Sequence, residues 1–176
     1  MKSIHSLNLA LLAGLVGLSI AVYPDLPSQI PVHFGGNGEA DLWATRTAMR
    51  WMLLPFVATG VCVITYFTAW LSLRDPRHVN VPDRNKLLSL PRESQMWVLQ
   101  GVANPIYLLA AVLNATMCLL QYGAYLTAMT GSGRTAILGG LVMALMSVPF
   151  MTVGVLVSFQ RRMDQAWRQH LITARG

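Results

Sequence analysis

The stretch VLQGVANPIYLLAAVLNATMCLLQYGAYLTAMT at residues 98–130 decides the fold, because it is long, apolar and free of Asp, Glu, Lys and Arg. Three further apolar runs share this character and lie at residues 7–22, 51–73 and 135–159. A helix needs about 20 apolar residues to cross the roughly 30 Å of hydrocarbon in a bilayer. Because backbone polar groups in lipid must pair within the chain, each run is expected to be a helix. The sequence therefore predicts an all-α integral membrane protein with four transmembrane helices.

The composition of the 176-residue chain leads to the same class. It is 54% hydrophobic and only 11% charged, against about 25% charged in an ordinary soluble domain. A soluble core of this length cannot bury so much apolar surface, and a disordered chain has low hydrophobicity and high charge. Once the four spans are removed, no basic, aromatic-bearing domain remains, so nucleic acid is not expected as a partner. The lipid bilayer is the expected environment.

Positive charges set the predicted orientation, because Lys and Arg collect in cytoplasmic loops. One side of the membrane would hold ten of the 13 basic residues: Lys2, Arg74, Arg77, Arg84, Lys86, Arg92, Arg161, Arg162, Arg168 and Arg175. The other side would hold Arg46, Arg50 and Arg134. Both termini are therefore predicted to be cytoplasmic. Cleavage of a signal peptide after Ala21 is an alternative, since Ser19 and Ala21 are small residues in the required positions.

The charge pattern also divides the chain into four parts. They are the first two helices with their outer loop (1–73, loop 23–48), a cytoplasmic loop (74–97), the third and fourth helices (98–159) and a basic cytoplasmic tail (160–176). The cytoplasmic loop is expected to be a short connection on the lipid headgroups. The tail is expected to extend the last helix, with Trp167 at the interface and basic residues that attract anionic lipid.

The outer loop carries the richest local sequence, YPDLPSQIPVHFGGNGEADLWATR at residues 23–46. Its three prolines disfavour a helix and favour extended backbone. The Gly-Gly-Asn-Gly stretch at residues 35–38 tolerates positive φ and predicts a tight turn. We therefore expect a short Pro/Gly-rich β-hairpin, with residues 30–34 on one side and residues 40–43 on the other.

The order of residues in this loop is similar to domain of unknown function 1648, which directly follows a first membrane helix in SdpI-like membrane proteins. The matching residues are Tyr23, Pro24, Leu26, Pro27, Ile30, Pro31, His33, Phe34, Gly38, Asp41, Trp43 and Arg46. Many members carry Lys at the position of Arg46. The resemblance covers roughly residues 7–70, including the spans on either side. The family's best-known branch protects a bacterium from its own secreted toxic peptide and signals its presence inward, so the resemblance implies immunity or signalling. Many other members have no assigned activity.

The outer loop also holds the candidate binding residues His33, Glu39, Asp41, Trp43 and Arg46. They can recognise a peptide or a membrane partner. A histidine with two carboxylates can also bind a divalent metal and support a membrane enzyme. The alternative is structural: Asp41 caps a helix that starts near residue 43 or 44, and His33 bonds the turn backbone. Arg46 can pair with Asp41, reach lipid phosphate, or do both.

The third run carries a regular face of polar and small residues. Its members are spaced four and three apart: Gln100, Asn104, Tyr107, Ala111, Asn114, Cys118, Gln121 and Tyr125. Polar groups are unfavourable in lipid, so this face should point into the bundle. It serves either to join helices or to line a water-filled groove of a small transporter-like protein. The fourth run has a matching stripe of mostly small residues: Gly140, Ala144, Ser147, Met151, Gly154 and Ser158. We therefore expect the third and fourth helices to pack along these two faces.

Pro105 in the third run has a separate consequence. A proline lacks the N–H that would bond a carbonyl one turn earlier in a helix. A carbonyl near the cytoplasmic end of the third helix is therefore expected to need another donor, such as a neighbouring amide.

No enzyme signature is present in the sequence. Gly-x-Ser-x-Gly, His-Glu-x-x-His and the Gly-Lys-Ser/Thr end of a phosphate-binding loop are all missing. Cys62 and Cys118 lie inside apolar runs and are expected to be core residues. The sequence thus predicts a non-enzymatic, multi-pass protein of the bacterial inner membrane without metal or other cofactor, and it leaves the oligomeric state open.

Overall fold

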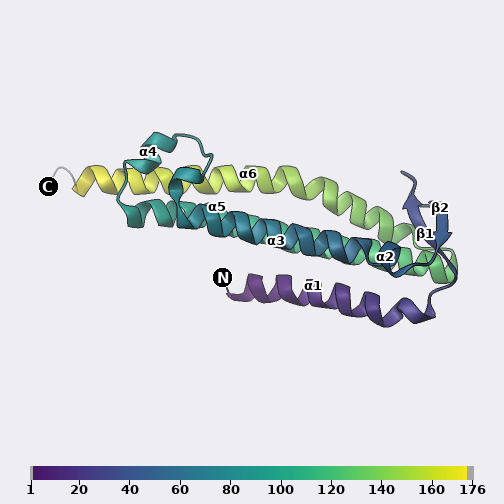
Figure 1. The fold of residues 1–176 in the computed structure, drawn as a ribbon. Coiled ribbons are helices and arrows are strands. Elements are labelled where there is room, and N and C mark those ends of the chain that lie inside the picture. Colours follow the sequence, from purple (N-terminus) through teal and green to yellow (C-terminus); the bar gives the residue numbers. More distant parts are fainter. Residues whose placement is uncertain (1, 174–176) are drawn as a thin grey trace.

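The computed structural model describes residues 2–173 and is an elongated bundle of helices with a small hairpin at one end (Figure 1). The long helices are α1 (Lys2–Val22), α3 (Leu53–Arg74), α5 (Arg92–Thr130) and α6 (Arg134–Thr173). The short elements are η1 (Tyr23–Asp25), β1 (Gln29–Phe34), β2 (Ala40–Thr45), α2 (Ala48–Trp51), η2 (Pro76–His78) and α4 (Arg84–Leu88). All four long helices are long and apolar enough to cross a membrane, which confirms the predicted fold class.

The two ends of the bundle differ in structure. The hairpin lies at one end, and the described ends of α1 and α6 nearest the termini lie toward the other (Figure 1). Following the predicted orientation, we call the hairpin end the outer end and the opposite end the inner end. The candidate recognition residues of the loop are all at the outer end.

Helices α5 and α6 are much longer than a membrane requires. They contain 39 and 40 residues, and at 1.5 Å per residue each is roughly 60 Å long, about twice the hydrocarbon thickness. Helix α5 begins before the apolar run, at Arg92, and α6 continues through the basic tail to Thr173. The predicted helical extension of the fourth span is confirmed.

The inner loop, predicted as a short connection, folds into a small core with the neighbouring helices. Its buried residues come from α4, the segment before α5, α5 and α6: Leu87, Leu90, Val98, Leu99, Phe159, Met163 and Ala166. Lys86 of α4 lies 3.8 Å from Asp164 and 5.3 Å from the centre of the Trp167 ring on α6. The apolar residues of the loop therefore pack against the extended ends of α5 and α6. The basic residues of the same loop set the predicted orientation.

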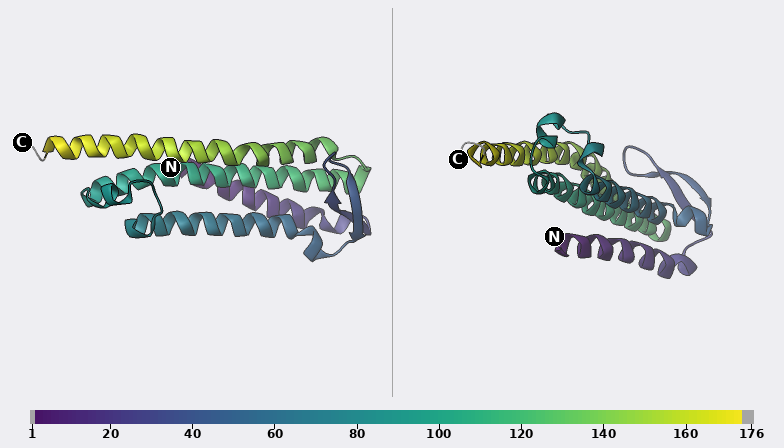
Figure 2. Two further views of the ribbon diagram at one scale, coloured as in Figure 1. Left: turned by 90° about the horizontal axis from the view of Figure 1, so that it is seen from above. Right: turned by 60° about the vertical axis from the view of Figure 1, so that its left-hand side comes forward.

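Helix α5 is the central element, and α6 lies beside it along much of its length (Figure 2). Glycines make the approach close. A Cβ on Gly123 would lie 2.8 Å from the Ile137 side chain, and a Cβ on Gly140 would lie 2.9 Å from Leu120. Small residues permit this approach between helices in lipid, where packing drives association. Of the predicted α6 stripe, Gly140 and Ser147 are buried, whereas Gly154 is exposed.

The polar face of α5 packs against α1 and α3, so the prediction that it meets the fourth helix is wrong. Asn114 is fully buried and its Nδ2 lies 3.0 Å from both Asn8 Oδ1 on α1 and Cys62 Sγ on α3. Asn8 Nδ2 in turn donates to the Tyr107 carbonyl at 3.0 Å. The physical reason is that α5 has two inward faces, and α6 takes the one with the glycines.

Three other residues of the polar face of α5 have different surroundings. The Tyr107 ring lies 4.7 Å from the His5 ring and 4.9 Å from the Tyr66 ring. Tyr125 packs on a core at the outer end. Asn104 Oδ1 is buried and has no hydrogen-bond partner among the described residues.

Two carbonyls that prolines leave without their helical donor accept side-chain hydrogen bonds from another helix. Pro105 frees the Gly101 carbonyl of α5, which accepts from Ser158 Oγ of α6 at 3.0 Å. Pro55 likewise frees the Trp51 carbonyl, which accepts from Gln121 Nε2 of α5 at 3.2 Å. The expected extra donor to the third helix is thus found, as a serine hydroxyl in place of an amide. These contacts favour a helix-joining role for the polar side chains.

Candidate recognition site at the outer end

The outer loop forms the predicted hairpin. Strands β1 and β2 are antiparallel, and the register pairs are Gln29 with Thr45, Ile30 with Ala44, Pro31 with Trp43, His33 with Leu42 and Phe34 with Ala40. The register is irregular on either side of His33. In the turn, the Gly35 N–H donates to the Glu39 carbonyl and the Gly38 N–H donates to the Gly35 carbonyl, both at 2.9 Å. Gly38 has φ +77°, which glycine adopts without steric strain.

The base of the hairpin is anchored in an apolar core between α1, α2 and α5. Leu26, Ile30, Trp51 and Ala124 are buried there together. Trp51 Nε1 donates to the Ser19 carbonyl of α1 at 2.9 Å, so the only polar group of the Trp51 side chain has a partner. The base of the hairpin is therefore packed directly on the helical bundle.

Arg46 closes the outer loop. Its Nη1 donates to the carbonyls of Tyr23 at 3.1 Å, Pro24 at 2.9 Å and Leu26. Its guanidinium carbon lies 5.3 Å from the centre of the Tyr23 ring. The prediction that Arg46 pairs with Asp41 is therefore wrong, because Asp41 pairs with His33 and Arg46 bonds backbone carbonyls in and just after η1. A contact between Arg46 and lipid phosphate stays a prediction.

Arg46→Lys is expected to loosen the hairpin, because a compact ammonium cannot reproduce the guanidinium's planar contacts with several carbonyls and a ring. Loss of one hydrogen bond to a charged group, about 1.5 kcal/mol, gives about tenfold faster amide exchange. Hydrogen exchange over residues 28–46 measures this effect. Arg50→Lys is the matched control, since Arg50 Nη1 makes one bond, to the Thr45 carbonyl at 2.7 Å. Equal exchange rates in the two variants would show that Arg46 does not hold the loop.

His33 and Asp41 form an exposed pair across the two strands. His33 Nδ1 lies 2.6 Å from Asp41 Oδ1, and the two side chains are 64% and 54% exposed. The alternative roles predicted for them are wrong. The helix after the hairpin starts at Ala48 and is capped by Thr47, whose Oγ1 accepts from the Arg50 N–H at 3.3 Å. His33 bonds the carboxylate of Asp41, not the turn backbone.

Glu39 points to a different partner. Its Oε1 lies 3.3 Å from Arg134 Nη1 at the start of α6, and its Oε2 accepts from Asn37 Nδ2 at 2.8 Å. The three residues considered for metal binding, His33, Glu39 and Asp41, thus belong to two separate pairs. Within residues 2–173 there is no group of three or more His, Cys, Asp or Glu side chains arranged to hold a metal ion. The ligand set proposed for a metal-dependent enzyme is not assembled.

Trp43 was predicted from the sequence, whereas Arg134 and Leu42 were not among the predicted binding residues of the site. Arg134 is 95 positions from Glu39, and only its positive charge on the predicted outer side marked it. Leu42 is 58% exposed and Trp43 is 43% exposed on β2. A cleft of about 340 Å³ lies between this strand and the α5–α6 turn. The cleft is lined by Gly38, Glu39, Ala40, Trp43, Thr127 and residues 131–134.

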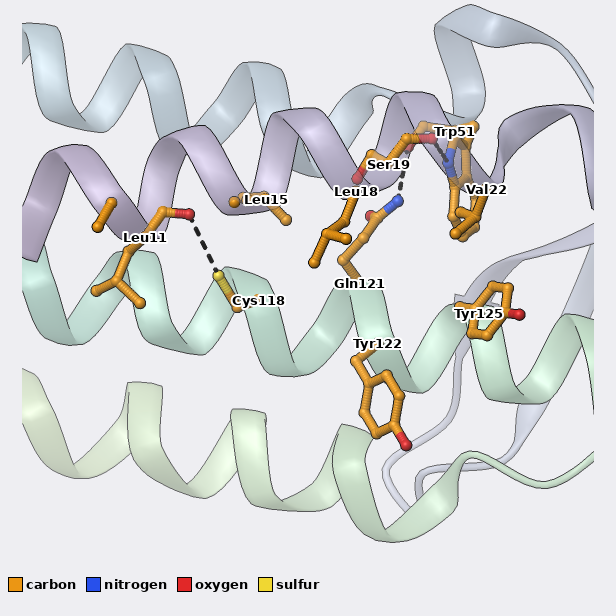
Figure 3. Close-up of a pocket in the computed structure, with 12 residues that line it drawn as sticks. Leu11, Leu15, Leu18, Ser19, Val22, Trp51, Cys118, Gln121, Tyr122 and Tyr125 are labelled. Carbon is orange, nitrogen blue, oxygen red and sulfur yellow. Dashed lines mark hydrogen bonds between the residues drawn. The ribbon is translucent and has the colours of Figure 1, made fainter.

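An apolar pocket of about 310 Å³ lies next to the base of the hairpin, between α1 and α5 (Figure 3). Its lining includes Leu15, Leu18 and Val22 of α1, Trp51 of α2, and Gln121 of α5. Ser19 also lines it, and the Ser19 hydroxyl is buried without a hydrogen-bond partner among the described residues. The outer end thus combines a polar hairpin surface with an apolar recess at membrane depth.

The fold and this site define a protein with four helices that can cross a membrane and a hairpin at one end. Residues 10–59 match a family model described as Domain of unknown function (DUF1648). The chain is 28% identical over 136 residues to an uncharacterized protein of Archaeoglobus fulgidus, an alignment that covers 74% of this chain and 73% of that one. No solved structure matches the chain. The matched family region contains the whole hairpin and its anchor Trp51.

Proposed function

We propose that this protein is a non-enzymatic, SdpI-like protein of the cell membrane that recognises a toxic peptide or a membrane partner at its outer end. One observation carries the proposal: the hairpin is fixed at its base by Ile30 and at its tip by the Glu39–Arg134 pair, yet it presents Leu42 and Trp43 to the outside. A rigid surface with an exposed tryptophan is well suited to binding, because less ordering entropy is lost when the partner docks.

The two edges of the hairpin support a peptide as the partner. An extended peptide can add to a strand whose N–H and C=O groups are unpaired on one side. β1 contains Pro31, which has no N–H to offer, whereas β2 contains no proline and is largely exposed. The apolar pocket beside Trp51 is available to a hydrophobic side chain or anchor of such a partner.

The alternative of a small transporter that uses the polar face of α5 has less support. Asn114 and Gln121 of that face are buried and donate hydrogen bonds to Asn8 and to the Trp51 carbonyl on neighbouring helices. A group engaged in this way joins helices and does not line a path for a solute. The hydrogen bonds within the membrane therefore favour a scaffold that carries the outer site.

The proposal is tested by purifying the wild-type protein and two variants from native membranes in mild detergent, with mass spectrometry for peptides, proteins and metals. Leu42→Ala with Trp43→Ala is expected to reduce the recovered partner at least about tenfold, since exposed aromatic residues are common hot spots. Leu145→Ala is the control, because Leu145 is 70% exposed on α6 away from the hairpin. Full recovery in the double variant would refute the outer site. A preparation with metal but no partner would favour the enzyme alternative.

A further inference from the structure

A pocket of about 580 Å³ lies at the inner end, between the end of α3, η2 and the start of α5. Three arginines line it, Arg74, Arg77 and Arg92, and Asp75 is the single carboxylate in the lining. Pro76, Leu88 and Gln95 complete it. Glu93 and Asp83 are near in sequence but are not part of the lining. The pocket therefore has a clear excess of positive charge.

The arginines are held in place and keep donors free for a ligand. The Arg74 guanidinium stacks over the Trp70 ring at 5.0 Å and donates to no acceptor among the described residues. Arg77 uses its Nε on Asp75 at 3.2 Å, and Arg92 uses one Nη on the Arg74 carbonyl at 2.8 Å. Each guanidinium has five N–H donors, so most of them remain.

The first turn of α5 adds to this potential. Pro91 occupies the N-cap position and provides no side-chain hydrogen bond. The leading N–H groups of a helix have no partner within the helix and carry the positive end of its dipole. The 39-residue α5 thus directs a partial positive charge to the side of the pocket where Arg92 lies.

The pocket is at the depth of lipid headgroups. Helix α3 has 22 residues and ends at Arg74, so it is about 33 Å long and spans the hydrocarbon once. One turn before its end, Trp70 is 49% exposed, and Phe67 is 58% exposed beside it. Aromatic residues at this level are typical of the membrane interface, where an acyl chain can lie along them.

We propose that this inner basic pocket binds the phosphate of an anionic phospholipid from the inner leaflet. The arginines and the start of α5 take the phosphate, and the exposed face of Trp70 and Phe67 takes the acyl chain. We expect this site to bind a phospholipid in preference to free phosphate, because the pocket opens next to that lipid-facing surface. The proposal is independent of the recognition function at the outer end, some 20 residues of helix away.

The test measures lipids retained by the purified full-length protein in neutral detergent, by native mass spectrometry with added phosphatidylglycerol or phosphatidylcholine. Arg74→Gln with Arg77→Gln is compared with Arg161→Gln with Arg168→Gln, which removes the same charge from α6. A basic residue near an anionic surface contributes about a fivefold change in affinity, so the pocket variant should bind phosphatidylglycerol about 25-fold more weakly. The α6 variant should change about twofold or less. Equal losses in both, or equal retention of both lipids by the wild type, would overturn the proposal.

Two further arms distinguish a bound lipid from diffuse attraction and from a free anion. Diffuse attraction is lost in high salt, whereas retention in the pocket is expected to persist. Inorganic phosphate alone should neither displace the lipid nor raise the melting temperature. If it does both, the pocket is a free-phosphate site and the lipid proposal fails.

A charge-preserving variant completes the test. Arg74→Lys with Arg77→Lys keeps both positive charges and is expected to regain at least half of the retention that the glutamine variant loses. Failure to regain any would overturn the proposal, because the positive charge of the pocket would then not be what holds the lipid.

Discussion

Replacement of Trp51 by alanine is expected to lower the free energy of unfolding by about 3–5 kcal/mol, as for other buried Trp→Ala changes. Trp51 is only 3% exposed and packs in the outer core with Leu26 and Ile30. Its removal leaves a cavity beside the existing apolar pocket and also deprives the Ser19 carbonyl of the indole hydrogen bond. The loss can be measured by reversible denaturation in mixed micelles.

Trp43→Ala is the matched control for this prediction. Trp43 is 43% exposed on β2, so its removal should change stability by less than about 1 kcal/mol. The two tryptophans lie close in sequence, and the proposed function assigns them opposite roles. Trp51 holds the site together, and Trp43 contacts the partner. Similar destabilisation by both variants would contradict this division.

The second large effect is expected at Gly133, which lies between α5 and α6. A Cβ there would be 2.0 Å from the Gly123 carbonyl oxygen and 2.3 Å from Thr127 Oγ1. Backbone cannot yield as a flexible side chain does, so the first turn of α6 must move away from α5. Gly133→Ala is therefore expected to destabilise the protein by about 3 kcal/mol, at the upper end for overpacking.

Gly139→Ala, six residues later and inside α6, is expected to stabilise the protein. Nothing lies within 4 Å of a Cβ at Gly139, and alanine is favoured over glycine in a helix by up to about 1 kcal/mol. The same denaturation experiment measures both variants. If Gly133→Ala were neutral, the close contact between the two helices at the outer end would be refuted.

The elements of the fold follow from local sequence, and several contacts do not. The uncharged runs predicted four helices, and the Pro and Gly residues of the loop predicted both strands and the turn. The spacing in residues 98–130 correctly identified an inward face. It did not identify which helix packs there, because α5 has both a polar face and a glycine-bearing face, and either one can pack against a neighbouring helix. Which neighbour takes which face depends on how α1 and α3 pack.

The site shows the same limit. Asp41 and His33 were expected to serve the backbone, but an irregular strand register places them side by side. Arg46 was expected to meet an anion, yet its described hydrogen bonds go to three carbonyls in and just after the short helix η1. Glu39 meets Arg134 only because the hairpin leans over α6, and no pattern within the loop specifies that contact.

The contact between the hairpin tip and α6 couples distant parts of the molecule mechanically. Glu39 and Gly38 lie against Arg134 and Leu138 in the first turns of α6. Helix α6 continues without interruption to Thr173 and its 40 residues extend about 60 Å. A lever of that length displaces its far end by about 1 Å for each degree of tilt. A load on the outer hairpin therefore acts on a helix whose inner half packs in the inner core, where Asp164 lies beside Lys86 of α4.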